Sequence, residues 1–210
     1  MPTVIIVLRT ALLWILCLGV ALVSWRFMVG GVEATMEFVA YHAHMRPIAF
    51  YSHVILAPIA LALVPFQLWE GLRQRRPHIH RLMGRLYGLA ILIAGLGGLW
   101  LAITTMAGPV AGFGFGTLAV LWLAVTGWGI SLAMRGDRVA HRRWMIRSIA
   151  LTLAAVTLRI QIPVSMMLDI PFDTAYPVIA WLCWVPNLVV AEMIVRWPRR
   201  PLVRLRAAAQ

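Results

Sequence analysis

The segment His141–Pro163, HRRWMIRSIALTLAAVTLRIQIP, most constrains how this chain can fold. Its apolar part is long enough to cross a bilayer as a helix, yet Arg159 lies deep within it. The residues from His141 to Arg159 span about five turns at roughly 3.6 residues per turn, so both side chains lie on one face, close to Ser148 and Thr152. Because lipid cannot satisfy polar groups, this stripe is predicted to face protein, water or a ligand.

The rest of the chain repeats this membrane character. It is 62% hydrophobic and 12% charged, which is typical of a membrane protein rather than a globular one. The pattern predicts an all-α, polytopic bundle of six transmembrane helices in a single membrane domain, 1–210. The segment GPVAGFGFG is predicted to be a short turn before the fourth helix. The six predicted helices cover residues 3–29, 48–69, 77–107, 117–134, 142–167 and 177–197.

The net charge of +12 comes from arginines alone among the basic residues. They cluster after the second and fourth spans and in the C-terminal tail, as topology determinants do, which argues against a nucleic-acid partner. By the positive-inside rule, both termini are predicted to be cytoplasmic. The tail is expected to lie on anionic lipid at that face.

Ionisable side chains within and beside the spans are the first functional candidates. His53 lies inside the second span, where such a group is either a hydrogen-bonded bundle residue or part of a site. In the loop before it, Glu33, Glu37, Tyr41 and His44 would share one face of a short helix. That face could bind a metal or simply lie solvated on the membrane surface.

Two further histidines, His80 and His141, each begin a helix after an arginine-rich turn. HRLMGR resembles HRRWMIR with one residue inserted; this is typical of duplicated hairpins, although short basic sequences also match by chance. The two histidines are predicted to approach each other and could ligate one haem iron or another metal. Alternatively, each caps a helix start. The face of His80 continues through Tyr87 and several glycines, which allow close helix packing.

Charges near the span ends need partners. Arg159 is predicted to meet an acceptor, either Asp169 or a bound anion. Glu192 is predicted to pair with His141, Arg143 or Arg147 at the foot of the fifth helix. Cys17 and Cys183, both in apolar spans, are expected to be buried free thiols.

Three stretches carry a family resemblance: HVILAPIALALVPFQLWEGLRQRRPHIHRLMGRLYG, GDRVAHRRWMIRSIALTLAAVTLR and NLVVAE. They are similar to a bacterial membrane-protein family known as domain of unknown function two-three-zero-six, over roughly Arg46 to Glu192. The resemblance implies a polytopic bacterial membrane protein and brings no established activity.

The residues therefore support competing functions. The first is a redox-related protein that binds haem b or a quinone through His53, His80, His141 and Arg159, with Tyr87, Ser148, Thr152 and Glu192 as supporting polar groups. The second is a small-anion transporter in which Arg159 binds the substrate. The third is a structural partner subunit, in which the polar stripe only joins helices. Hydrolytic motifs such as GxSxG and HExxH are lacking.

Overall fold

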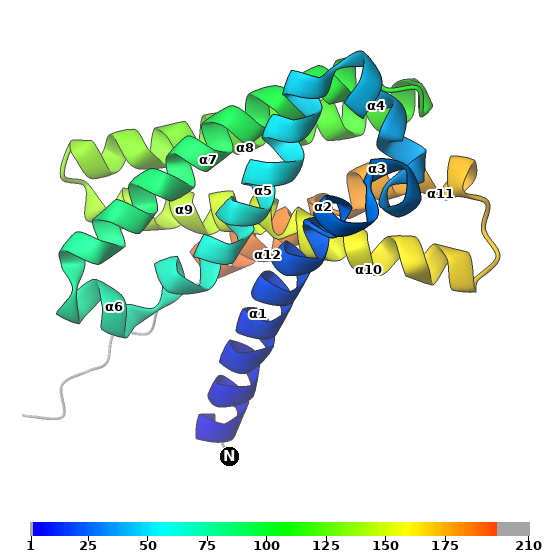
Figure 1. Ribbon diagram of the computed structural model, residues 1–210. Coiled ribbons are helices and arrows are strands. Elements are labelled where there is room, and N and C mark those ends of the chain that lie inside the picture. Colours follow the sequence, from blue (N-terminus) through cyan, green and yellow to red (C-terminus); the bar gives the residue numbers. More distant parts are fainter. Residues whose placement is uncertain (1, 197–210) are drawn as a thin grey trace, which may run out of the picture.

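The computed structural model describes residues 2–196 and folds them into a bundle of helices with no strand in that range (Figure 1). Six helical stretches are long and apolar enough to cross a membrane, which confirms the predicted fold class. They are formed by α1 (Pro2–Ser24) with α2 (Phe27–Gly30), α5 (Pro47–Leu68), α7 (Pro77–Ile103), α8 (Gly108–Met134), α9 (Arg138–Thr152) with α10 (Ala154–Met167), and α11 (Phe172–Leu182) with α12 (Val185–Arg196).

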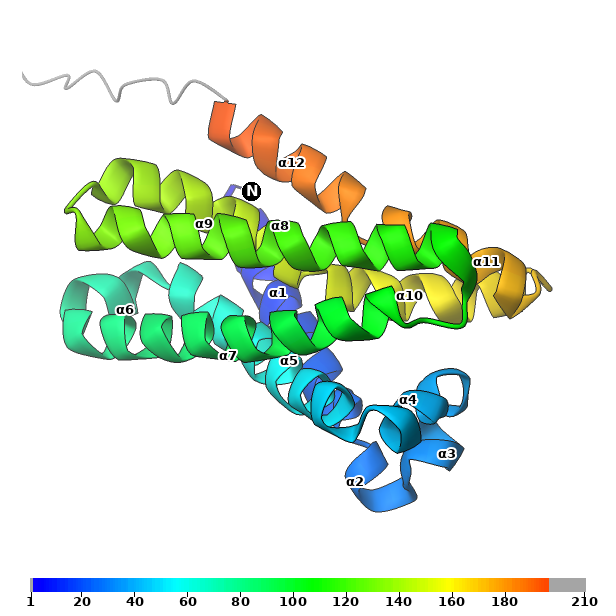
Figure 2. The same ribbon diagram turned by 90° about the horizontal axis from the view of Figure 1, so that it is seen from above.

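The spans pack in order around a common core. α5 packs on α7, α7 on α8, and α8 on both α9 and α11, while α12 lies against α9 (Figure 2). α1 contacts α5 and α10, and only its second half, including the buried Cys17, joins the core. Cys17 and Cys183 are both buried free cysteines, as expected.

Helix boundaries depart from the predictions mainly at one end of the bundle. The glycine-rich segment predicted as a turn is the start of α8, which begins at Gly108 with Pro109 in its first turn. Gly108 takes a positive φ of 86° at the turn into α8, whereas Gly114 serves helix packing, because a side chain there would collide with Ala180 of α11. The third span ends at Ile103 rather than residue 107, and the sixth begins at Phe172 rather than residue 177.

The fifth span also begins earlier than predicted, at Arg138, because the Asp137 carboxylate accepts a hydrogen bond from the backbone N–H of Ala140 at 2.9 Å. This is a typical helix N-cap.

Two of the spans are broken in the middle. α9 and α10 meet at Leu153, just after Thr152, whose hydroxyl donates to the Ser148 carbonyl at 3.0 Å, an interaction that often bends helices. α11 and α12 meet before Pro186, which has no N–H for the Leu182 carbonyl. Gln161 of α10 donates to that carbonyl at 3.2 Å instead. The proline break is therefore compensated by a neighbouring helix, as apolar surroundings require.

Short helices close one end of the bundle. Between the first two spans lie α3 (Val32–Thr35), the 3₁₀ helix η1 (Glu37–Val39) and α4 (Ala40–Met45). We call residues 32–45 the roof. Phe38 stacks on Phe172, with ring centroids 3.9 Å apart. The Tyr41 hydroxyl accepts a hydrogen bond from the Met106 N–H at 2.9 Å. The roof is thus tied to both α11 and the turn between α7 and α8.

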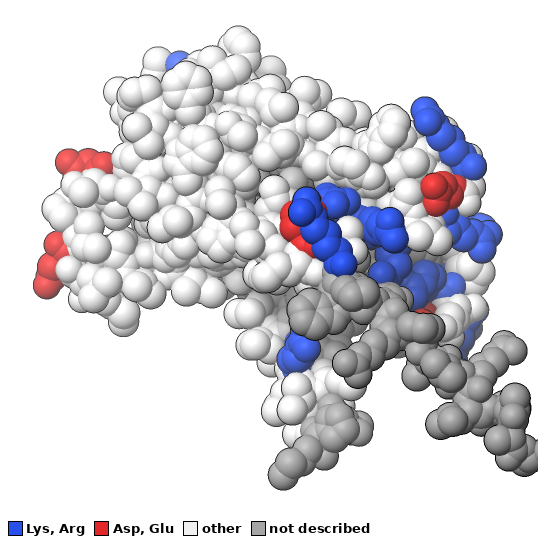
Figure 3. Space-filling model, turned by 180° about the vertical axis from the view of Figure 1, so that it is seen from behind, with Lys and Arg blue, Asp and Glu red and all other residues white. Residues whose placement is uncertain are grey.

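The two ends of the bundle differ in charge. Basic side chains gather toward the end of the bundle that carries α6 (Glu70–Arg75) and the α8–α9 turn. Two acidic patches lie at the other end (Figure 3). We call them the arginine-rich end and the roof end. The predicted interaction of the tail with anionic lipid concerns residues 197–210, which lie outside the described residues.

Candidate functional site

A cavity of about 560 Å³ lies inside the bundle beneath the roof. It is lined by α5, α7, α8, α9, α10 and α11, by Ser24 and Arg26 near the end of the first span, and by roof residues from Ala34 to His42. Most of its wall is apolar, but His53 and Arg159 both line it. A shallower hollow of similar size runs along α12 and encloses no buried polar side chain. Since small-molecule sites typically measure about 300–1,000 Å³, the roofed cavity is the candidate site.

His53 is held in one orientation by the neighbouring helix α7. Its Nδ1 lies 2.9 Å from the Ala94 carbonyl oxygen, which can only accept a hydrogen bond. Nδ1 therefore carries the proton in the neutral ring and donates it to Ala94, leaving Nε2 as an acceptor. A side chain on Gly98 would collide with the imidazole, so this glycine is what lets α7 approach the ring.

Arg159 enters the cavity from α10 without a carboxylate partner. Its Nη1 donates to the Ala155 carbonyl one turn earlier, at 3.1 Å. The predicted pairing with Asp169 is wrong: no ion pair joins Arg159 to any carboxylate within residues 2–196, and Asp169 lies exposed in the turn after α10 at φ 53°. Arg159 is near enough to Arg26, Tyr176 and His53 to interact with them electrostatically, and Arg26 also lines the cavity. Within residues 2–196, no carboxylate therefore lies within ion-pair distance of the Arg159 guanidinium.

The polar stripe continues from the cavity into a closed hydrogen-bond network. The Tyr87 hydroxyl, fully buried, lies 2.7 Å from Thr152 Oγ1 and 3.0 Å from Ser148 Oγ. Trp122 donates its indole N–H to Thr152 at 2.9 Å, and Thr126 lies 2.6 Å from Ser148. Every hydroxyl here has a protein partner, so the Ser148 portion of the stripe joins helices. Only Thr152 and Arg159 of the stripe reach the cavity wall.

His80 and His141 lie at the arginine-rich end, apart from the cavity. They are near enough to interact electrostatically. His141 Nδ1 donates to the Gly129 carbonyl at 2.7 Å, while the buried Nδ1 of His80 has no hydrogen-bond partner among the described residues. No group of three or more His, Cys, Asp or Glu in the described part of the chain could hold a metal ion. Haem ligation by this pair stays a prediction, and these histidines do not share a site with His53.

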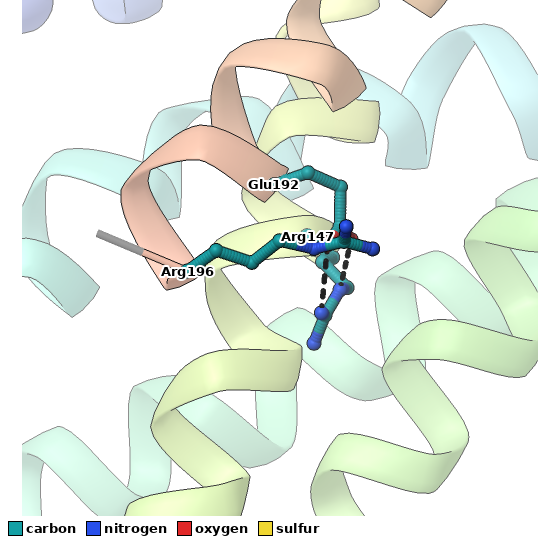
Figure 4. Close-up of polar contacts among 3 residues, drawn as sticks. All are labelled: Arg147, Glu192 and Arg196. Atoms are coloured by element: carbon teal, nitrogen blue, oxygen red, sulfur yellow. Dashed lines mark hydrogen bonds and ion pairs between the residues drawn. The ribbon is translucent and has the colours of Figure 1, made fainter. Parts of the chain in front are cut away.

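Glu192 has one of its predicted partners. Arg147 donates to its carboxylate through Nε at 2.5 Å and through Nη2 at 3.0 Å, and Arg196 donates through Nε at 3.2 Å (Figure 4). The bidentate pair joins α12 to α9. The carboxylate is shared between two guanidinium groups, so this cluster keeps a net positive charge at the arginine-rich end.

The roof contains residues whose roles the sequence pattern did not indicate. The face predicted for Glu33, Glu37, Tyr41 and His44 does not exist as one surface, because the segment breaks into α3, η1 and α4. Glu33 pairs with His44 at 2.8 Å in the open, whereas Glu37 lines the cavity. His42, next to Tyr41, is 4% exposed and also lines the cavity. No periodicity signals His42, since its burial depends on how the roof folds over the bundle.

Comparison with known proteins supplies the family. A family model described as "Predicted membrane protein (DUF2306)" matches residues 50–195, which include His53 and Arg159. The roof lies outside the matched segment. Comparison with curated proteins and with solved structures gave no match.

Proposed function

We propose that this chain, which belongs to the DUF2306 family of predicted membrane proteins, binds a lipid-soluble quinone or its quinol in the roofed cavity. The observation that carries this proposal is that a donor with no ion-pair partner in residues 2–196, Arg159, and a fixed acceptor, His53 Nε2, line one cavity whose wall is mostly apolar.

The donor and acceptor match the two redox forms of such a ligand. A quinone oxygen can only accept a hydrogen bond, which Arg159 can supply. A quinol hydroxyl can also donate one, which the lone pair on His53 Nε2 can accept. The apolar wall suits the ring and the start of an isoprenoid tail. A redox role for the protein would build on this binding.

The first test is chemical. Protein purified in mild detergent is extracted and its bound lipids are identified by mass spectrometry, where we expect quinone to be enriched over its share of the membrane extract. Delipidated protein is then titrated with a short-chain benzoquinone and with the corresponding quinol, and binding is followed calorimetrically.

The variants separate the site from the scaffold. Arg159→Gln removes the charge, and His53→Asn keeps a donor for Ala94 while removing the Nε2 acceptor. We expect Arg159→Gln to weaken quinone binding about tenfold or more, and His53→Asn to weaken quinol binding more than quinone binding. Arg138→Gln, the same change at an exposed position of the arginine-rich end, should bind like the wild type. Absence of both co-purified and titrated quinone binding would end the proposal.

A second candidate rests on the unneutralised charge of Arg159. A partly buried guanidinium with no ion-pair partner in the described chain also suits a small organic anion, as a transporter of carboxylates would require. In the same titration, a medium-chain carboxylate in place of quinone would bind the wild type and lose affinity in Arg159→Gln. Uptake of the carboxylate into proteoliposomes would then favour transport.

The haem hypothesis has its own readout in the same preparation. A Soret band that disappears in both His80→Ala and His141→Ala would favour haem at the arginine-rich end. A colourless preparation that still binds quinone would remove haem from the proposed function.

A further inference from the structure

His42 is the least exposed polar group of the roof. It lies in the middle of α4, its side chain is only 4% exposed, and it lines the roofed cavity. Its Nδ1 is buried and has no hydrogen-bond partner among the described residues. Buried polar atoms are nearly always hydrogen-bonded, so this ring nitrogen calls for a partner that the protein itself does not provide.

The ring of His42 has a packing partner within the roof. The Tyr41 ring lies against it, with centroids 4.1 Å apart. Tyr41 is fixed in turn, since its hydroxyl accepts from the Met106 N–H at 2.9 Å and lies 3.4 Å from Thr105 Oγ1. The turn between α7 and α8 thus holds the roof, and with it His42, over the cavity.

The imidazole is neutral at physiological pH. Burial, and secondarily the positive charge of Arg46, lower the pKa of His42 from its ordinary value near 6.5 to about 4. A neutral imidazole offers one hydrogen-bond donor and one acceptor, and it carries no net charge with which to attract an ion. His42 therefore suits an uncharged oxygen, in contrast to Arg159.

We propose that His42 is a ligand-contacting residue, whose protonated Nδ1 donates a hydrogen bond to the second oxygen of a para-quinone while Arg159 donates to the first. His53 Nε2 accepts from that first oxygen only when the ligand is the quinol. A para-quinone carries its two oxygens at opposite ends of the ring. His42 reaches the cavity from the roof. His53 reaches it from within α5, about 9 Å along the helix axis from Pro47, the first residue of α5, at roughly 1.5 Å per residue. This inference rests on the proposed function and adds a contact that selects ligands with two opposed oxygens.

The test compares two ligands and three proteins. The ligands are a 1,4-benzoquinone with a short alkyl tail and an alkylphenol of matched tail, which has only one oxygen. His42→Leu removes the ring nitrogens, and His42→Asn keeps a polar atom close to the position of Nδ1. The wild type should prefer the quinone to the phenol. His42→Leu should weaken quinone binding about three- to tenfold and leave phenol binding unchanged, whereas His42→Asn should keep most of the preference.

Thermal unfolding of the ligand-free proteins distinguishes a contact from a structural role. Because Nδ1 has no partner in the described chain, His42→Leu should unfold at the same temperature as the wild type or higher. A lower unfolding temperature, with both ligands weakened equally, would overturn the proposal.

The remaining outcomes separate this inference from the proposed function. If the wild type binds quinone through Arg159 but His42→Leu binds both ligands like the wild type, only the role of His42 falls. If the wild type binds no quinone, the proposed function and the role of His42 both fall.

Discussion

At the scale of single residues, this protein keeps several ionisable groups in apolar surroundings and treats each one differently. Glu192 is neutralised by Arg147. His53 is fixed by a backbone carbonyl. Arg159 and His42 instead face a cavity with hydrogen-bonding capacity to spare. Since unsatisfied polar groups are unfavourable in such surroundings, the last two mark the place where a ligand would contribute most.

His42 also makes stability depend on pH in a defined direction. Its pKa of about 4 in the folded chain lies below its ordinary value near 6.5, so the unfolded chain binds the proton more readily between these values. Stability should therefore be complete above about pH 6.5 and should fall as the pH drops toward 4. Thermal unfolding at pH 7.5 and pH 4.5 should show a larger loss for the wild type than for His42→Asn. Equal losses in the two proteins would contradict this origin.

At the scale of elements, polar contacts between helices compensate for irregular backbone. Gln161 donates to the carbonyl left free before Pro186, and the Tyr87 network joins α7, α8 and α9 through buried side chains. The bidentate Arg147–Glu192 pair joins α9 to α12 near the arginine-rich end. In apolar surroundings these contacts replace the hydrophobic effect as the source of specific helix pairing.

The Arg147–Glu192 pair gives the sharpest test at this scale. Glu192→Gln should lower the free energy of unfolding by about 1–3 kcal/mol, because it leaves the partly buried guanidinium of Arg147 without its counter-charge. Glu70→Gln is the matched control, since Glu70 pairs with Arg73 at 3.3 Å on the exposed surface and should lose about 0–1 kcal/mol. Thermal unfolding in one detergent compares the two. Equal losses would mean that the α9–α12 pairing contributes little.

At the scale of the whole molecule, charge separates the two ends of the bundle (Figure 3). The cavity lies beneath the roof, away from the arginine-rich end. If the arginine-rich end faces the cytoplasm, as the positive-inside rule predicts, the roof and its cavity lie toward the outer leaflet.

Reporter fusions test this orientation. Alkaline phosphatase fused in the turns at 104–107 or 168–171 should be active, because these turns would lie outside the cytoplasm. Fusions at 69–76 or 135–137 should be inactive there and active with a cytoplasmic reporter such as green fluorescent protein. The opposite pattern would reverse the topology and place the roofed cavity toward the cytoplasmic leaflet.

The amino-acid sequence by itself determined the number of spans, the basic and acidic ends, and the existence of a polar stripe through Ser148, Thr152 and Arg159. These properties follow from hydrophobicity and charge read along one chain, together with helical periodicity. The partner of Glu192 was also within reach, because both residues lie at a similar depth in neighbouring spans.

Only the tertiary structure decided which polar groups meet. Gly114, which the sequence placed in a turn, packs within α8 against Ala180 of α11, a contact between helices far apart in sequence. The gathering of His53 and Arg159 around one cavity, and the burial of His42 above it, depend on how the roof folds across α7 and α11. Such long-range contacts leave no periodic signal in a single sequence, because each residue of the site belongs to a different element.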